Sequence, residues 1–235
     1  MAAKRLPYSD EERIQVVRDI IDQEELAGKE DTILSVRVLH DMRNLLLTFE
    51  GTCFCFKQAL SDETNAANKH NELFKSAQLY ISHFIQVLNL AIIRNEIRVD
   101  SLGFYGLENS NQFTVPDLST EDAVLEWGEK VINGELQRTR QGGAPIYNPA
   151  IAKVKVHYDL FKDSQYSLQI YRKNTIRNEG TLSEQREKIN SLIWETWSLV
   201  EDKYWDLPQD ERKQKFKDYH ICFNYQHGVQ LSVFG

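Results

Sequence analysis

The sequence predicts a mainly α-helical protein of about seven helices in bundle-like packing, with a small C-terminal β-hairpin. Apolar residues recur at helical spacing over most of the chain, capping patterns precede several of these runs, and strict alternation begins only near the C-terminus. The 235 residues are 41% hydrophobic, which suffices for a sizeable core. We expect either one domain or two helical halves, 1–141 and 142–235.

Four helices are expected in the first half of the chain. Ser9 and Glu12 form a capping box, Gly28 offers a stop, and Gly51 could kink the second helix. A glycine-containing polar stretch reads as a long loop before the fourth helix, which Ser119 or Thr120 begins. The expected helices cover 9–28, 31–60, 61–93 and 119–141, with the loop at 99–120.

Three further helices are expected in the second half. Asn148 would cap the first, with Pro149 as its first helical residue, and Thr181 with Glu184 would open the next. The expected ranges are 148–180, 181–205 and 206–219. The alternating residues 219–233 then predict a hairpin with Gly228 at its turn. A lone hairpin is marginally stable, so its face must pack on the helices or its edge must pair with another chain.

Charge and cysteine content argue for a soluble protein of the cytoplasm. The chain carries 28 Lys+Arg and 35 Asp+Glu, and a net charge of -7 gives no general attraction to nucleic acid or acidic membranes. Three cysteines are too few for a disulfide framework and fit a reducing compartment. We see no secretory signal, and polar residues interrupt the most apolar run, 79–93. We therefore predict no membrane and no nucleic-acid partner.

Common catalytic motifs are absent from the sequence. There is no phosphate-binding glycine loop, no dinucleotide-binding fingerprint, no zinc-protease motif and no nucleophile elbow. No Glu-x-x-His pair occurs, which argues against a di-iron helical bundle. We expect no cofactor, and a non-enzymatic role is favoured over an enzymatic one.

The segment around residues 138–148 is the strongest candidate for ligand binding. Arg138 and Arg140 lie near a predicted helix C-terminus, and Gly142 and Gly143 would let backbone amides approach an anion. Asn148 begins the next helix, whose N-terminus also favours negative charge. The site would hold a phosphate or a carboxylate; the alternative is a flexible turn after a helix whose charges match its dipole.

Two weaker patterns could bind a metal. His220 and Cys222 would project from the same face of a strand, with His227 at the turn, and such N and S ligands suit zinc. The alternative is a hairpin with His and Cys on its exposed face. The pair His40 and Asp41 resembles the metal-binding dipeptide of helical phosphohydrolases, which would need further ligands from His70, His83 and His157. A solvated pair is the simpler interpretation.

The second half resembles a group of uncharacterised bacterial helical proteins. The resemblance rests on Trp127 through Glu135, the pair Gly142 and Gly143, Asn148 with Pro149, and a Trp-rich helix that ends in Glu201. It implies a helical fold but no activity and no functional residue.

From these observations we expect an interaction or assembly protein that self-associates through helix faces or through the hairpin. The alternative is a small-ligand, anion-binding or metal-binding helical protein, conceivably a hydrolase. The expected partner is therefore a second copy or another protein.

Overall fold

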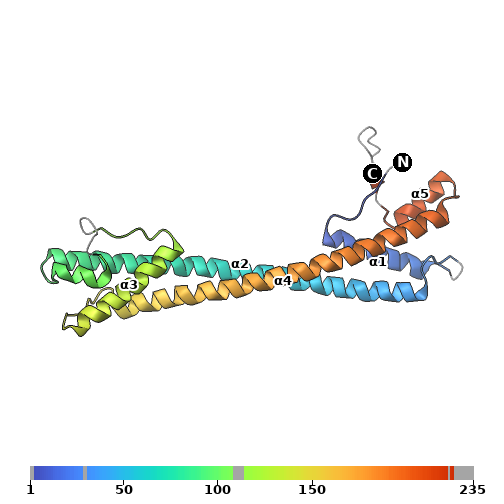
Figure 1. The fold of residues 1–235 in the computed structure, drawn as a ribbon. Helices are drawn as coiled ribbons and strands as arrows, with labels where there is room; N and C mark the ends of the chain where they lie inside the picture. The colour runs from blue at the N-terminus through green and yellow to red at the C-terminus, as the bar shows by residue number, and fades with distance from the viewer. Residues whose placement is uncertain (1–2, 29–30, 108–113, 222, 225–235) are drawn as a thin grey trace. The chain divides into compact units, whose positions relative to one another are not determined.

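The computed structural model describes residues 3–28, 31–107, 114–221 and 223–224, and this part of the chain is mainly helical (Figure 1). It forms five α-helices and one 3-10 helix, fewer than the seven helices expected. Their bounds are α1 Asp10–Leu26, α2 Val36–Ile93, η1 Val99–Tyr105, α3 Glu121–Arg140, α4 Ile151–Tyr204 and α5 Gln209–Asp218.

Two expected helix boundaries are wrong. The single helix α2 replaces the two predicted helices 31–60 and 61–93, and it continues through Gly51. In the same way, α4 replaces the two predicted helices 148–180 and 181–205. Thr181 does not cap a helix, because its Oγ1 donates to the carbonyl of Arg177 at 3.1 Å, as hydroxyls in helix interiors do. Ser9 and Thr120 do cap α1 and α3, accepting from the amides of Glu12 and Ala123.

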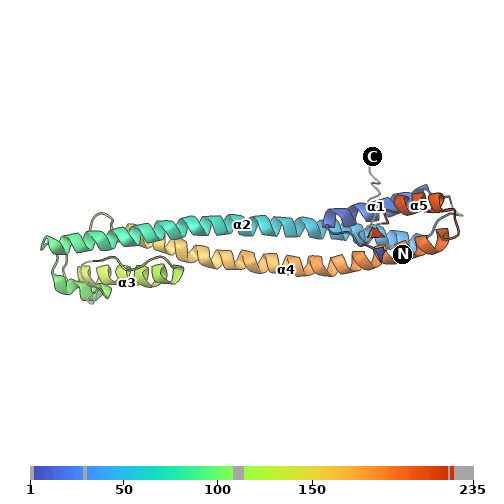
Figure 2. The ribbon, with the colours of Figure 1, turned by 90° about the horizontal axis from the view of Figure 1, so that it is seen from above.

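The described residues form two compact units. Unit 1 combines residues from 1–59 and 175–235, and unit 2 comprises residues from 60–174. Residues 141 and 142, where the sequence analysis placed a boundary, both lie within unit 2. Within each unit, segments of α2 and α4 lie side by side and run in opposite directions (Figures 1 and 2).

A repeat of seven residues organises the packing of α4 and α2. On α4, the buried positions seven residues apart are Val154, Phe161, Leu168, Thr175, Leu182, Ile189 and Thr196, and on α2 they include His70, Ala77, Phe84 and Ala91. This spacing is typical of coiled-coil seams. Two of the polar seam residues have hydrogen bonds to the facing helix: His70 Nδ1 lies 2.8 Å from Ser164 Oγ, and Thr175 Oγ1 donates to the carbonyl of Ala59 at 3.2 Å.

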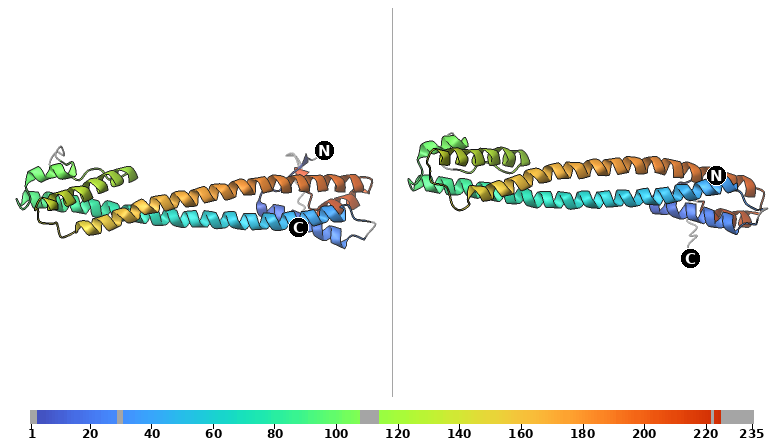
Figure 3. Two further views of the ribbon diagram at one scale, coloured as in Figure 1. Left: turned by 60° about the horizontal axis from the view of Figure 1, so that its bottom comes forward. Right: turned by 90° about the horizontal axis from the view of Figure 1, so that it is seen from below.

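In unit 1, α1 and α5 contact each other, and their apolar residues belong to one core with α2 and α4 (Figure 3). The buried Glu24 on α1 accepts hydrogen bonds from the amides of Ile33 and Leu34 and from the Tyr219 hydroxyl. Trp197 Nε1 donates to the Tyr219 carbonyl at 3.0 Å. These bonds tie Tyr219, the residue after α5, to both α1 and α4.

The structure describes only the start of the predicted C-terminal hairpin. The strand β2, Phe223–Asn224, pairs antiparallel with β1, Ala3–Lys4, near the opposite end of the chain. The predicted turn and second strand, 226–233, lie outside the described residues.

In unit 2, α3 and η1 pack on α2 and α4 over an apolar core. Two helical glycines of α3 allow this close packing. A Cβ on Gly128 would lie 2.3 Å from the Tyr158 ring, and one on Gly134 would lie 2.6 Å from the carbonyl oxygen of Phe104. Part of the predicted loop 99–120 therefore forms η1, which packs where α3 carries no side chain.

We predict that Gly128→Ala destabilises unit 2, because the added methyl overlaps the buried Tyr158 ring; overpacking of this kind costs about 1–3 kcal/mol. Gly180→Ala is the matched control, since a Cβ there meets nothing within 4 Å. It should stabilise the protein by about 0.5–1 kcal/mol through helix propensity. Urea unfolding measures both changes, and equal effects of the two substitutions would contradict the packing at Gly128.

The Asp10 carboxylate accepts from Arg186 Nε and Nη2 at 2.8 and 2.6 Å, and these hydrogen bonds hold its pKa below the usual value. A lowered pKa stabilises the fold above the unfolded-state pKa of about 3.9, and that stability is lost as pH falls through the folded-state pKa. We predict that Asp10→Asn makes the free energy of unfolding fall less steeply than in wild type between pH 6 and pH 3. Urea titrations at both pH values test this, and parallel losses in the two proteins would refute it.

Candidate functional site

A buried ion pair lies near the C-terminal end of α3. Glu135 is fully buried and Arg138, one turn later, has a side chain only 6% exposed. Arg138 Nε donates to Glu135 Oε2 and Arg138 Nη2 to Oε1, both at 2.9 Å. Two parallel bonds of this kind are the strongest form of a carboxylate and guanidinium contact. The pair brings no net charge into the unit.

Tyr105 and the loop after α3 complete this network. The Tyr105 hydroxyl donates to Glu135 Oε2 and accepts from Arg138 Nε at 2.9 Å. Burial and the bond to Glu135 raise the pKa of Tyr105, which keeps the phenol neutral at physiological pH. Glu135 Oε1 also accepts from the amide of Ile146 at 3.0 Å, and Arg138 Nη2 donates to the carbonyl of Ala144 at 2.7 Å. The network therefore joins η1 and the 141–147 loop to α3.

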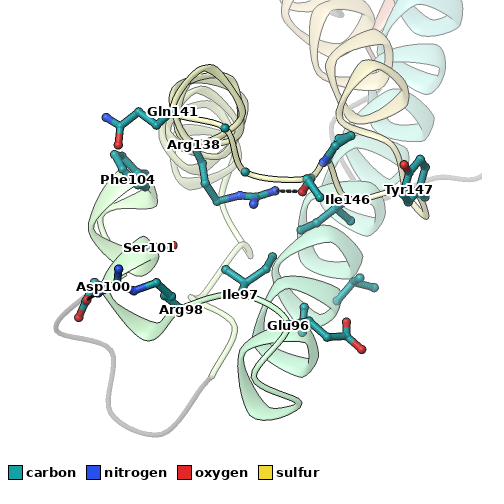
Figure 4. Close-up of a pocket in the computed structure, with 16 residues that line it drawn as sticks. Glu96, Ile97, Arg98, Asp100, Ser101, Phe104, Arg138, Gln141, Ile146 and Tyr147 are labelled. Atoms are coloured by element: carbon teal, nitrogen blue, oxygen red, sulfur yellow. Dashed lines mark hydrogen bonds and ion pairs between the residues drawn. The ribbon is translucent and has the colours of Figure 1, made fainter.

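A cavity of about 810 Å³ adjoins the network (Figure 4). Its wall combines the end of α2, the start of η1, the end of α3 and the loop that follows. Arg138 points into it, and its Nη1 has no hydrogen-bond partner among the described residues. The other polar or charged residues on the wall are Glu96, Arg98, Asp100, Ser101 and Gln141, and the apolar ones include Ile97, Phe104, Pro145 and Ile146.

The structure brings together only part of the predicted anion site. Arg138, Gly142 and Gly143 line the cavity, whereas Arg140 and Asn148 are exposed and do not. The amides of Gly142 and Gly143 donate to the carbonyls of Thr139 and Arg138, at 3.0 and 3.2 Å, so they are not oriented toward a ligand.

The expected helix start at Pro149 is wrong as well. The α4 helix begins at Ile151, and the peptide bond between Asn148 and Pro149 is cis. Asn148 therefore does not direct a helix N-terminus at the cavity.

Only one of the three predicted metal ligands at the C-terminus can be placed. His220 Nδ1 lies 2.8 Å from Asp19 Oδ2, an acidic residue of α1. Cys222 and His227 lie outside the described residues. Within the described ranges, no three His, Cys, Asp or Glu side chains gather closely enough to hold a metal ion.

The other histidines contact separate partners. His40 Nε2 lies 3.0 Å from Asn44 Nδ2, one turn along α2 in unit 1. In unit 2, His70 Nε2 lies 3.0 Å from Glu121 Oε1, His157 Nδ1 lies 3.0 Å from Ser76 Oγ, and His83 is exposed.

A second feature of interest is an exposed apolar face of α2 in unit 1. Leu47 and Phe54 are 68% and 70% exposed, although both are large apolar side chains. Gly51 lies between them on the same face, and a Cβ there would meet nothing within 4 Å. Glycine inside a helix costs about 0.5–1 kcal/mol relative to alanine, and no contact among the described residues requires it here.

Helix α2 is also the one described helix long and apolar enough to span a membrane by length and composition. Its most apolar window is 44% buried within the structure. A core helix of a soluble protein passes the same test, so this is a weak indication of a membrane location.

The sequence analysis missed Glu135 and Tyr105, the two partners of Arg138. A signal for Glu135 was present, because Glu135 and Arg138 are three residues apart and share one helix face. No local signal pointed to Tyr105, which is 33 residues from Arg138 along the chain.

Comparison with protein-family models, with curated proteins and with solved structures gave no match. The fold and the site are therefore interpreted from their own geometry.

We predict that Glu135→Gln destabilises unit 2 by about 3–5 kcal/mol, because it leaves the buried Arg138 cation unbalanced. Glu126→Gln on the same helix is the control: it breaks the exposed pair with Lys130 and should cost less than about 1 kcal/mol. Replacing both Glu135 and Arg138 by apolar residues should recover much of the loss, measured by urea unfolding. Similar small effects of both single substitutions would contradict the assignment of a buried ion pair.

Proposed function

We propose that the protein is a non-enzymatic assembly protein whose copies associate through the α2 face formed by Leu47, Gly51 and Phe54. The supporting observation is the exposure of the two large apolar side chains on either side of a glycine that no contact in the described part of the chain requires. A second copy of the chain is the occupant that this face fits best, because of its symmetry.

The face is nearly symmetric about Gly51. Leu47 lies four residues before the glycine and Phe54 three residues after it, so both are one turn away on the same side of the helix. If two copies of α2 cross in opposite directions at Gly51, Leu47 of each copy meets the partner's Phe54. Such self-complementarity is what a two-fold symmetric interface needs.

The lack of a side chain at Gly51 allows the two helix backbones to approach closely. The neighbouring hydroxyls of Thr48 and Thr52 already donate to the carbonyls of Asn44 and Thr48 at 2.8 Å each. Their burial in an interface therefore leaves no hydroxyl donor unpaired. Small residues with satisfied polar groups, flanked by large apolar ones, suit a helix-to-helix contact.

The C-terminal hairpin was the other surface expected to associate. Its first strand pairs with β1 within the same chain, and the rest lies outside the described residues. The α2 face is therefore the surface on which the proposal rests.

We predict that Gly51→Ala changes stability and association in opposite directions. Helix propensity should raise the monomer's free energy of unfolding by about 0.5–1 kcal/mol. The new methyl groups would separate the crossing helices and weaken self-association at least tenfold. Sedimentation velocity over a range of protein concentrations measures association, and urea unfolding at low concentration measures stability.

Phe54→Glu should abolish self-association, since it places a carboxylate in the apolar contact. Leu79→Glu is the matched control, because Leu79 is 63% exposed on the part of α2 that belongs to unit 2. A wild-type protein that stays monomeric at every concentration would overturn the proposal. So would a Gly51→Ala variant that is more stable yet associates as wild type does.

A further inference from the structure

We infer that the cavity beside Arg138 binds a small uncharged ligand that carries a carbonyl oxygen on an apolar body. This inference is independent of the proposed self-association, since the cavity lies in unit 2 and the face around Gly51 in unit 1.

The donor for such a ligand is Arg138 Nη1. The other guanidinium nitrogens, Nε and Nη2, are fully engaged with Glu135, Tyr105 and the Ala144 carbonyl. Nη1 has no partner among the described residues, although the side chain is only 6% exposed. Nη1 faces the open cavity, where a ligand oxygen would accept a charge-assisted hydrogen bond from it. Figure 4 shows the guanidinium directed into the cavity.

The charges around the cavity favour a neutral ligand over an anion. The Arg138 charge is already balanced by Glu135, and Arg98 pairs with Asp100 at 3.0 Å. Glu96 adds a further carboxylate to the wall. On the wall, two carboxylates therefore offset two guanidinium groups, and the buried Glu135 pairs with Arg138 from behind, so the cavity offers no unbalanced positive charge to a carboxylate or phosphate ligand. This replaces the anion predicted from Arg138 and Arg140, because Arg140 does not line the cavity.

Gly143 keeps Nη1 accessible. A Cβ at this position would lie 2.6 Å from Arg138 Nη1. The residue is not among the glycines with positive φ, so its backbone conformation does not itself require glycine. The close approach to the guanidinium is the feature that excludes a side chain at Gly143.

The remaining wall suits an apolar body of modest size. Ile97, Phe104 and Ile146 present apolar side chains to the cavity. Its volume, about 810 Å³, lies within the range of about 300–1,000 Å³ typical of small-molecule sites. A ligand with an aromatic ring against these side chains and a carbonyl oxygen at Nη1 would match both the apolar wall and the hydrogen-bond donor.

The test is a titration of the intact protein with benzamide, benzoate and benzylamine, which share a ring but differ in charge and acceptor. The backbone amide signals of Gly142 and Gly143 in ¹H–¹⁵N spectra report binding at the cavity. We expect saturable shifts with benzamide, at least tenfold weaker binding of benzoate, and no saturable binding of benzylamine.

Two variants assign the binding to this cavity. Gly143→Ala covers Nη1, Phe104→Ala removes part of the apolar wall, and each should weaken benzamide binding at least tenfold. Arg140→Ala is the control and should bind as wild type does. Circular dichroism and the melting temperature establish that each variant is folded; if Gly143→Ala is not, Phe104→Ala decides.

Three results would overturn the inference. Benzoate binding as tightly as benzamide would restore the anion site. The absence of saturable benzamide binding would remove the site altogether. Unchanged benzamide affinity in a folded Gly143→Ala or Phe104→Ala variant would show that the ligand does not use this cavity.

Discussion

The burial of every seventh residue along α4 is the constraint on which both units depend. Val154 and Phe161 supply it in unit 2, and Leu182 and Ile189 in unit 1. In each unit these residues pack in one core with α2, and the shorter helices complete that core. Neither unit can form without its segments of the two long helices, because the shorter helices alone offer too little apolar surface.

The sequence predicted the helical class and the caps at Ser9 and Thr120, but not the continuity of α2 and α4. The apolar pattern fades where the seam contains polar residues such as His70 and Thr175. Thr181 resembles a helix cap close to Thr175, so the local rules indicated a helix end that tertiary hydrogen bonds and seam packing override. The hydrogen-bond partner of His70 is Ser164, and that of Thr175 is the Ala59 carbonyl. Both partners lie far away along the chain, so the local sequence gives no signal of them.

The sequence predicted where the candidate site lies, but not how its charges are balanced. Arg138 and the two glycines after it do line one cavity, as their unusual clustering suggested. The expected anion depended on an unbalanced Arg138, however, and the charge of a side chain cannot be assessed without its neighbours. Glu135 balances that charge and Tyr105 reaches it from another helix. Arg138 therefore brings no unbalanced positive charge to the cavity.

The division of the chain between the units has a consequence for synthesis on the ribosome. Unit 2 is a continuous stretch, residues 60–174, so all of its partners have been made once that stretch has emerged. Unit 1 needs residues beyond 175 to cover the apolar faces of α1 and the first part of α2. Val17, Ile20 and Phe49 therefore leave the ribosome well before their α4 partners and stay uncovered until those partners have been made. In this interval the nascent N-terminal segment is the part of the protein most in need of a chaperone.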